Sequence, residues 1–288
     1  MYLAVRDRDK ELAPIGRLAD ENSCPMNLRA RIFRAMSSTG RQRPDRFRLL
    51  GVAVDRLTVA EAANRVEALI AAGGVGQVVT VNPEFVMAAR RHRQFRRVLN
   101  QAALAVADGI GIVLAARILG DCLPERVGGI DLVEAVAERC AGSGRRLFLL
   151  GGAPGVVEAA AEALRVRFPA LVVAGTYAGS PEPRDFPAIR ARIHAARPDL
   201  LLVAFGAPAQ DLWIARHQGE LAVPAAMGVG GAFDFLAGRI RRAPRWMQRL
   251  GLEWFYRLAL QPWRWRRMLA LPRFGAMVVA LRLAGRPR

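Results

Sequence analysis

The feature that most constrains the fold of this chain is an alternation of short apolar runs with longer amphipathic segments after residue 48. Six runs have the composition of buried strands: Val78–Val81, Leu104–Ala107, Leu147–Leu150, Leu171–Thr176, Leu200–Phe205 and Ala225–Val229. Seven segments space their apolar residues approximately as helices do: Val59–Ala72, Pro83–Leu99, Gly111–Leu119, Leu132–Cys140, Val156–Phe168, Phe186–Ala196 and Gln210–Gln218. Short apolar strands that alternate with helices are typical of a mostly parallel sheet covered by helices on both faces. The sequence therefore predicts an α/β fold of the Rossmann-like type.

Charge divides the chain into three parts. The net charge is +18, of which residues 1–48 carry +5, residues 49–240 carry +2 and residues 241–288 carry +11. A basic excess confined to one segment favours a polyanionic partner that meets that segment. We therefore predict a poorly ordered extension over residues 1–47, an α/β domain over 48–238 and a basic helical appendage over 239–288. A short helix around Pro25–Met36 is expected inside the extension.

Composition argues against several classes of protein. With 52% hydrophobic residues, the chain is too apolar to be disordered as a whole. Its three cysteines have no CxxC spacing, which favours a reducing, cytosolic compartment over a disulfide framework. The three histidines are scattered without the spacing of metal ligands, so we expect no metal site. These residues are Cys24, Cys122, Cys140, His92, His194 and His217.

No segment predicts a signal peptide or a membrane span. The stretch from Arg6 to Glu11 is dense in charge, unlike the basic and then apolar pattern of a signal peptide. A span needs about 20 predominantly apolar residues, and the best candidate, Met268–Leu283, is interrupted by Pro272 and Arg273. We therefore expect a protein that does not cross a membrane.

Polar or glycine-rich turns follow five of the predicted strands. Ligands of parallel α/β sheets bind beyond the carboxyl ends of the strands, so these turns predict a nucleotide site on one rim of the sheet. The turns are Asn82-Pro83, Asp108-Gly109, Gly151–Gly155, Gly206-Ala207-Pro208 and Gly230-Gly231.

Some of these turns also have simpler structural explanations. Asn82 and Pro83 suit the start of a helix, and Thr80 is then an ordinary strand residue. Asp108 is equally compatible with a helix cap and with a base, because a helix N-terminus keeps a carboxylate ionised. The Gly151–Gly155 turn has the glycines of a phosphate loop but matches neither GxxxxGK[ST] nor GxGxxG. The strand after it ends without the acidic residue of an NAD site, which argues against an NAD enzyme.

The basic C-terminal segment interleaves arginine with tryptophan. Four of the five tryptophans, Trp246, Trp254, Trp263 and Trp265, lie in it. Arginine and tryptophan at helical spacing suit a helix that lies in an anionic interface. A solvated basic helix that buries its tryptophans as a core is the alternative. Nucleic acid is a third possibility, weakened because the rest of the chain is nearly neutral, and we expect no nucleic-acid partner.

Taken in order, these motifs resemble the WecG/TagA/CpsF family of glycosyltransferases, glycosyltransferase family 26. The similarity extends from about Leu49 to Arg267, and the extension over residues 1–47 falls outside it. The matching stretches are Thr80–Glu84, Ala107–Gly111, Glu125–Leu132, Gly151–Gly155, Phe205–Gln210, Gly228–Asp234, Arg242–Trp246, Gly251–Trp254 and Tyr256–Leu258.

The resemblance implies an inverting, metal-independent enzyme that works on the bacterial cytoplasmic membrane without a cofactor. Members of the family transfer a hexosyl group, often N-acetylmannosamine or its uronic acid, from a UDP-sugar to a polyprenyl-diphosphate-linked sugar. The resemblance thus implies a cytoplasmic protein attached peripherally to the inner face of the membrane. Its expected partners are the UDP-sugar, the lipid-linked acceptor and the anionic membrane surface, with a homo-oligomer as a further possibility.

The resemblance also implies roles for individual residues. Asp108 becomes the candidate general base, with Thr80 and Asn82 beside the sugar donor. Arg257 is expected to act in catalysis from an appendage that closes over the site and helps to bind diphosphate. The expected substrate-binding residues are Asn82, Arg126, Gly151, Gly152, Gly206, Gln210, Gly230, Gly231, Asp234, Arg264 and Arg267.

One departure from the family leaves the donor open. The family often has Pro-Lys-Gln-Glu where this chain has Pro208-Ala209-Gln210-Asp211, so donor preference cannot be carried across. UDP-glucose or UDP-N-acetylmannosaminuronic acid, used in exopolysaccharide synthesis, are alternative donors. A protein that binds nucleotide-sugars or nucleic acid without catalysis is an alternative from a different class.

Overall fold

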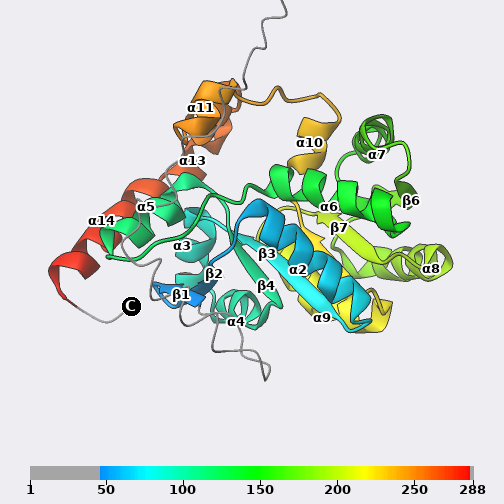
Figure 1. Cartoon of the computed structure of the whole chain (residues 1–288), viewed down its shortest axis with the longest axis horizontal. Coiled ribbons are helices and arrows are strands. Elements are labelled where there is room, and N and C mark those ends of the chain that lie inside the picture. Colours follow the sequence, from blue (N-terminus) through cyan, green and yellow to red (C-terminus); the bar gives the residue numbers. More distant parts are fainter. Residues whose placement is uncertain (1–45, 286–288) are drawn as a thin grey trace, which may run out of the picture. The chain divides into compact units, whose positions relative to one another are not determined.

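The computed structural model describes residues 46–285, and Figure 1 shows the chain coloured along its sequence. Nearly all of the predicted extension over residues 1–47 lies outside the described residues, and so does the short helix expected around Pro25–Met36. Of that extension only Arg46 and Phe47 are described, and they begin strand β1.

Six parallel strands form the sheet of the described domain. They are β3 (Gly76–Val81), β4 (Leu104–Ala107), β5 (Arg146–Gly151), β6 (Val172–Tyr177), β7 (Leu200–Ala204) and β8 (Ala225–Gly228). Their order across the sheet is β4-β3-β8-β7-β5-β6, and every neighbouring pair is parallel. All six predicted strands are present, and the predicted α/β class is confirmed.

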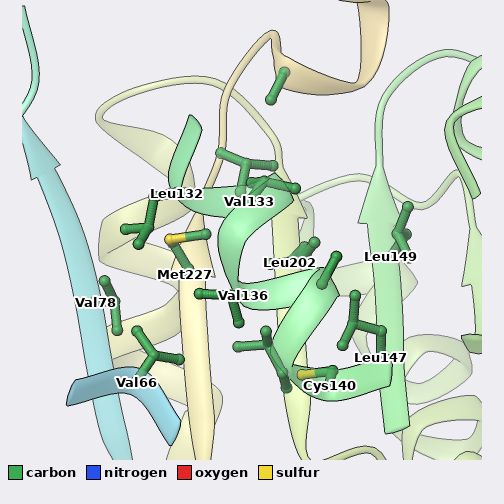
Figure 2. Packing of buried hydrophobic residues seen from close by; sticks show 14 of the residues in the cluster. Val66, Val78, Leu132, Val133, Val136, Cys140, Leu147, Leu149, Leu202 and Met227 are labelled. Atoms are coloured by element: carbon green, nitrogen blue, oxygen red, sulfur yellow. The ribbon is translucent and has the colours of Figure 1, made fainter. Parts of the chain in front are cut away.

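Helices cover both faces of the sheet, because successive strand residues point to opposite sides. On β3, Val78 packs into a cluster with α2, α6 and α7, whereas Val79 packs with α3, α4 and α5 on the other face. Figure 2 shows the first cluster, where Leu132 and Val136 of α6 lie against Met227 of β8. Helices α8 and α9 cover the second face at the other end of the sheet. These helices are α2 (Val59–Ala71), α3 (Pro83–Arg91), α4 (Arg93–Gln101), α5 (Ile110–Ile118), α6 (Gly129–Ser143), α7 (Val156–Arg167), α8 (Phe186–Ala196), preceded by η1 (Pro183–Asp185), and α9 (Ala209–Leu221).

Two local features differ from the sequence prediction. The domain begins with an antiparallel hairpin of β1 (Arg46–Leu49) and β2 (Val52–Asp55), which the sequence analysis did not predict. Its buried Asp55 pairs with Arg46 and accepts a hydrogen bond from the backbone N–H of Ala105 in β4, so the hairpin is tied to the edge of the sheet. The single helix predicted over Pro83–Leu99 is instead two helices, because His92 between α3 and α4 has an extended backbone.

The basic C-terminal segment is helical, in short pieces. After α10 (Ala232–Leu236) come α11 (Arg245–Arg249), α12 (Glu253–Leu260), η2 (Pro262–Arg264), α13 (Trp265–Met268) and α14 (Ala270–Leu283). Helix α14 lies beside α3 and α5 (Figure 1). Its side chains Phe274 and Val278 are buried in the cluster that α3 and α5 form with this face of the sheet. Within residues 46–285 no helix is both long and apolar enough to span a bilayer.

Candidate active site

A pocket of about 480 Å³ opens at the carboxyl ends of β3, β4 and β8. Strand β3 lies between β4 and β8 in the sheet. Its neighbour β4 is the next strand along the chain, whereas β8 on the other side follows only after β5, β6 and β7. The order in which strands are added therefore reverses between β3 and β8. The helix after β3 covers one face and the helix after β8 covers the other. This is the topological switch point at which open α/β sheets form their ligand crevice.

Asp108 lies in this pocket, directly after β4. Its backbone N–H donates to the carbonyl oxygen of Val81 at 2.8 Å, which fixes the strand end. Burial raises the pKa of Asp108 to about 6, while Arg126 and a hydrogen bond from the backbone of Gly129 hold it down. Gly109 follows with a φ of 91°, a conformation that glycine adopts without strain. The carboxyl group therefore titrates near neutral pH, as a general base requires.

Three helices begin at the pocket. The first residues of α3, α5 and α6 all line it, among them Pro83, Ile110 and Gly129. Asn82 caps α3, because its side-chain oxygen accepts a hydrogen bond from the N–H of Phe85 at 2.9 Å, and its expected place beside the sugar donor stays a prediction. Helix N-termini carry partial positive charge and exposed N–H groups. Their convergence makes the pocket favourable for an anion.

A closed ring of ion pairs joins the α/β domain to the C-terminal segment. Arg126 contacts Asp131 at 3.1 Å and Glu253 at 3.0 Å. Arg242 contacts the same two carboxylates, Asp131 at 2.6 Å and Glu253 at 3.3 Å. The four side chains are 20–28% exposed, so solvent screens them only in part. We call this group the ion-pair ring. It holds α12, which lines the pocket and which we call its roof, against the α/β domain.

Arg257 of α12 lines the pocket and lies against Gly231 and Phe235, which line it as well. Its guanidinium lies 5.0 Å from the ring centre of Phe235 and packs so closely on Gly231 that a Cβ there would collide with it. Burial lowers the pKa of Arg257, as does the neighbouring Arg267, against the opposing effect of Asp234. A buried cation close to another cation is stabilised by any anion that enters the pocket.

Two further arginines stand beside Arg257. Arg264 lines the pocket, and burial together with Arg257 and Arg267 lowers its pKa to about 10. Arg267 pairs with Glu84, in the first turn of α3, at 2.7 Å. Within residues 46–285 neither Arg257 nor Arg264 has a carboxylate oxygen within ion-pair distance. The C-terminal segment thus brings a cluster of positive charge to the pocket.

The structure brings about half of the predicted site residues together in this pocket. Those that line it are Thr80, Asn82, Asp108, Arg126, Gly231, Arg257 and Arg264. Arg267 adjoins the pocket through Glu84, and Asp234 adjoins it through Gly231.

The remaining predicted residues lie outside the lining. The N–H of Gly152 donates to the carbonyl of Ala204, and the buried Gln210 accepts the N–H of Gly230 at 3.0 Å, which shapes the turn after β8. Gly151 ends β5, which lies two strands from β8 across the sheet. A substrate-binding role stays a prediction for these positions, which are Gly151, Gly152, Gly206, Gln210 and Gly230.

Sequence reasoning missed Asp131, Arg242 and Glu253, although each lies in a stretch that resembles the family. Their role depends on partners more than 100 residues apart, and no local pattern indicates such pairing. Among residues 46–285 no group of three or more His, Cys, Asp or Glu side chains is placed to hold a metal ion.

The tryptophans of the C-terminal segment lie on its surface. Trp246, Trp254, Trp263 and Trp265 are all exposed, Trp263 to 71%. The alternative in which a basic helix buries these rings as a core is therefore wrong.

The parallel sheet, with a pocket at the carboxyl ends of its strands, defines an α/β protein of the Rossmann-like type, and comparison with known proteins gives its family. The profile of the glycosyl transferase WecG/TagA/CpsF family matches residues 47–288. The chain belongs to this family and is a glycosyltransferase.

Relatives with assigned activities cover most of the chain. It is 35% identical over 206 residues to the N-acetylglucosaminyldiphosphoundecaprenol N-acetyl-beta-D-mannosaminyltransferase of Bacillus subtilis strain 168, a match that covers 71% of this chain and 80% of that protein. It is 34% identical over 229 residues to the protein of the same name from Staphylococcus aureus strain MW2, covering 78% and 89% of the two chains.

Proposed function

We propose that this glycosyltransferase moves an N-acetylmannosaminyl group from a UDP-sugar to a polyprenyl-diphosphate-linked N-acetylglucosamine, with inversion at the anomeric carbon. The observation that carries the proposal is the pairing, in one pocket, of a carboxyl group whose pKa is raised to about 6 with two arginines that have no carboxylate partner among residues 46–285. The names of the relatives from Bacillus subtilis and Staphylococcus aureus supply the sugar and the acceptor.

In the proposed reaction Asp108 accepts the proton of an acceptor hydroxyl as its oxygen attacks the anomeric carbon. The bond from that carbon to the UDP oxygen breaks, and UDP leaves with the electron pair. Thr80 and Asn82 orient the donor sugar beside Asp108. Arg257 neutralises the negative charge that develops on the leaving diphosphate, the type of stabilisation on which such transfers depend. Arg264 binds the diphosphate of the acceptor.

The departure from the family at Pro208–Asp211 does not favour another donor. Ala209, Gln210 and Asp211 do not line the pocket, and Asp211 is fully buried beneath the sheet end. Gln210 and Asp211 lie against Gly228 at the end of β8, outside the pocket lining. The mannosaminyl donor of the relatives is therefore the donor we propose.

The C-terminal segment also supports attachment to a membrane surface. It presents exposed Trp246, Phe255, Trp263 and Trp265 beside its arginines, on short helices that do not bury these rings. Aromatic rings beside arginine are suited to the headgroup region, and each arginine near an anionic leaflet adds on the order of 1 kcal/mol. We place the segment on the inner face of the cell membrane, where a lipid-linked acceptor is available.

A donor screen tests the proposal. Full-length protein is incubated with a panel of UDP-sugars and synthetic prenyl-diphosphate N-acetylglucosamine, and products are identified by mass and by anomeric configuration. We expect the disaccharide from UDP-N-acetylmannosamine, in the inverted configuration. Transfer from UDP-glucose or UDP-N-acetylmannosaminuronic acid alone would overturn the proposed donor.

The same assay tests metal independence. Because Arg257 supplies positive charge for the departing diphosphate, activity is expected to survive excess EDTA. Loss of activity in EDTA, restored by Mg²⁺ or Mn²⁺, would show that a metal ion carries this charge instead.

A further inference from the structure

The pocket continues past the arginines as an apolar trough between α5 and α14. One wall is formed by Ile110, Leu114 and Ile118 of α5, and the other by Leu271, Phe274 and Val278 of α14. The proposed sugar transfer uses none of these six side chains. We call this part of the pocket the α5–α14 trough.

Sequence spacing explains why the two walls are continuous. The three α5 residues are four positions apart, and the three α14 residues are three and four apart, so each set forms one stripe along its helix. The stripe of α14 is largely buried, whereas Leu114 is 45% exposed and Ile118 is 44% exposed. Exposed aliphatic side chains on one wall leave apolar surface available to a ligand.

Gly275 marks open space in the trough. It lines the pocket on α14, and a Cβ built there would meet no atom within 4 Å. A larger side chain at this position would therefore project into free volume, where it would obstruct the trough without disturbing the packing around it.

The polar and apolar parts of the pocket follow one another along a single stretch of chain. Arg264 ends η2, Met268 ends α13 and Leu271 lies in the first turn of α14, and all three line the pocket. A ligand that spans both parts must carry an anionic group joined directly to a hydrocarbon chain. A prenyl diphosphate has this structure, whereas a UDP-sugar has no hydrocarbon chain.

We propose that the α5–α14 trough binds the first isoprene units of the acceptor lipid, next to its diphosphate on Arg264. This inference rests on the proposed function, because it takes the acceptor to be a prenyl diphosphate. The trough draws the start of the chain out of the membrane and fixes the sugar with respect to Asp108. Burial of hydrocarbon in the trough supplies binding free energy, so the acceptor binds more tightly when its first isoprene units fill more of the trough.

Acceptors of different chain length test this directly. Full-length protein is assayed without membranes or detergent on N-acetylglucosaminyl diphosphates that carry an ethyl, a geranyl or a farnesyl group, each below its micellar concentration. We expect KM to fall at least about tenfold from the ethyl to the farnesyl acceptor, since each buried methylene contributes roughly 0.8 kcal/mol, about a fourfold change, with kcat nearly constant. Equal KM values for the three acceptors would overturn the proposal.

A matched pair of variants locates the effect. Leu114→Gln changes a trough residue, and Val279→Gln changes an α14 residue outside the pocket lining that is equally exposed, at 48%. We expect Leu114→Gln to raise KM for the farnesyl acceptor about tenfold and to leave KM for the ethyl acceptor unchanged, whereas Val279→Gln changes neither. Gly275→Leu, which replaces glycine by a better helix former, is expected to act like Leu114→Gln. Equal effects of Leu114→Gln and Val279→Gln would contradict the proposal.

Photo-crosslinking tests the trough without turnover. A farnesyl diphosphate N-acetylglucosamine that carries a benzophenone on its chain is irradiated with the protein, and labelled peptides are mapped. Label within residues 110–118 and 268–278 supports the trough even if no sugar is transferred, an outcome that would refute only the proposed function. Label confined to other segments would overturn the trough while leaving the sugar transfer in place.

Discussion

At the scale of single residues, Asp108 is the side chain on which the proposed chemistry depends most. We expect Asp108→Asn to keep the fold and UDP binding but to lower turnover about 100-fold or more, as is typical when a positioned base is lost. Turnover is measured with a soluble prenyl acceptor, and UDP binding by calorimetry. Asp185→Asn changes a half-buried carboxylate that accepts a hydrogen bond from the N–H of Ser180 and lies outside the pocket lining; it serves as the control and should leave turnover unchanged. Near-normal turnover in a folded Asp108→Asn protein would remove Asp108 from the reaction.

The raised pKa of Asp108 also predicts the pH dependence of the reaction. A base accepts a proton only when it is ionised, and burial raises the pKa of this carboxyl to about 6. We therefore expect kcat/KM to rise tenfold per pH unit below about 6 and to level off above it. The profile is measured between pH 5 and pH 8 with the soluble acceptor. A profile already level at pH 5 would mean that another group sets the rate.

Asp211 affects stability rather than chemistry. It is 0% exposed, and burial raises its pKa to about 7 from an ordinary value of 3.8. The folded state therefore binds a proton more tightly than the unfolded state, so stability decreases as pH rises from about 4 to 7. Asp211→Asn should raise the free energy of unfolding by roughly 2–4 kcal/mol at pH 8 and by almost nothing at pH 4. Urea denaturation at both pH values measures this, and an equal effect at both would contradict it.

At the scale of elements, the sequence predicted the strands of the large sheet well and the first hairpin not at all. Five of the six strands are buried along most of their length on both faces, so they are continuous apolar runs that the sequence pattern reveals, whereas the edge strand β6 is only half-buried. Strand β1 alternates arginine with buried Phe47 and Leu49, and its stability depends on Asp55, which pairs across the hairpin. The break at His92 left no pattern either, since both flanking segments are amphipathic.

The ion-pair ring holds α12, the roof of the pocket, against the α/β domain. We expect Arg242→Gln to loosen α12, to raise KM for both substrates several-fold and to speed proteolysis between residues 236 and 245. A double-mutant cycle with Asp131→Asn should give a coupling energy of about 0.5–1.5 kcal/mol in unfolding experiments. The cycle is repeated at high salt, where partly exposed pairs are screened. A coupling energy near zero would show that the ring does not hold the roof.

At the scale of the whole molecule, one segment supplies both the cations of the pocket and the proposed contact with the membrane. Arg257→Ala should impair turnover severely, because it removes a buried cation from the pocket, yet keep most liposome binding, because the segment stays strongly basic. Arg273→Ala removes the same charge from a residue that does not line the pocket, and should keep turnover. Both variants are assayed for cosedimentation with anionic liposomes and for transfer to the soluble acceptor. Equal turnover in the two would assign the segment to anchoring alone.

The candidate site was predictable where it follows strands and unpredictable where it depends on distant contacts. Thr80, Asn82 and Asp108 lie at strand ends that the apolar pattern located. The basic composition of the C-terminal segment marked its importance, but it gave no sign that Glu253 reaches back to Arg126. Such pairing is a property of the folded chain and not of any stretch of sequence.

The distance along the chain between Arg126 and Glu253 has a consequence for biosynthesis. Asp108 and Arg126 of the pocket are encoded in the first half of the chain, whereas Glu253, which pairs with Arg126, follows 127 residues after it. Domains fold as they leave the ribosome, N-terminal parts first. A growing chain thus carries a folded sheet and an unroofed pocket until the arginine-rich helices emerge. The proposed catalytic arginines and the proposed membrane contact therefore emerge together, after the sheet.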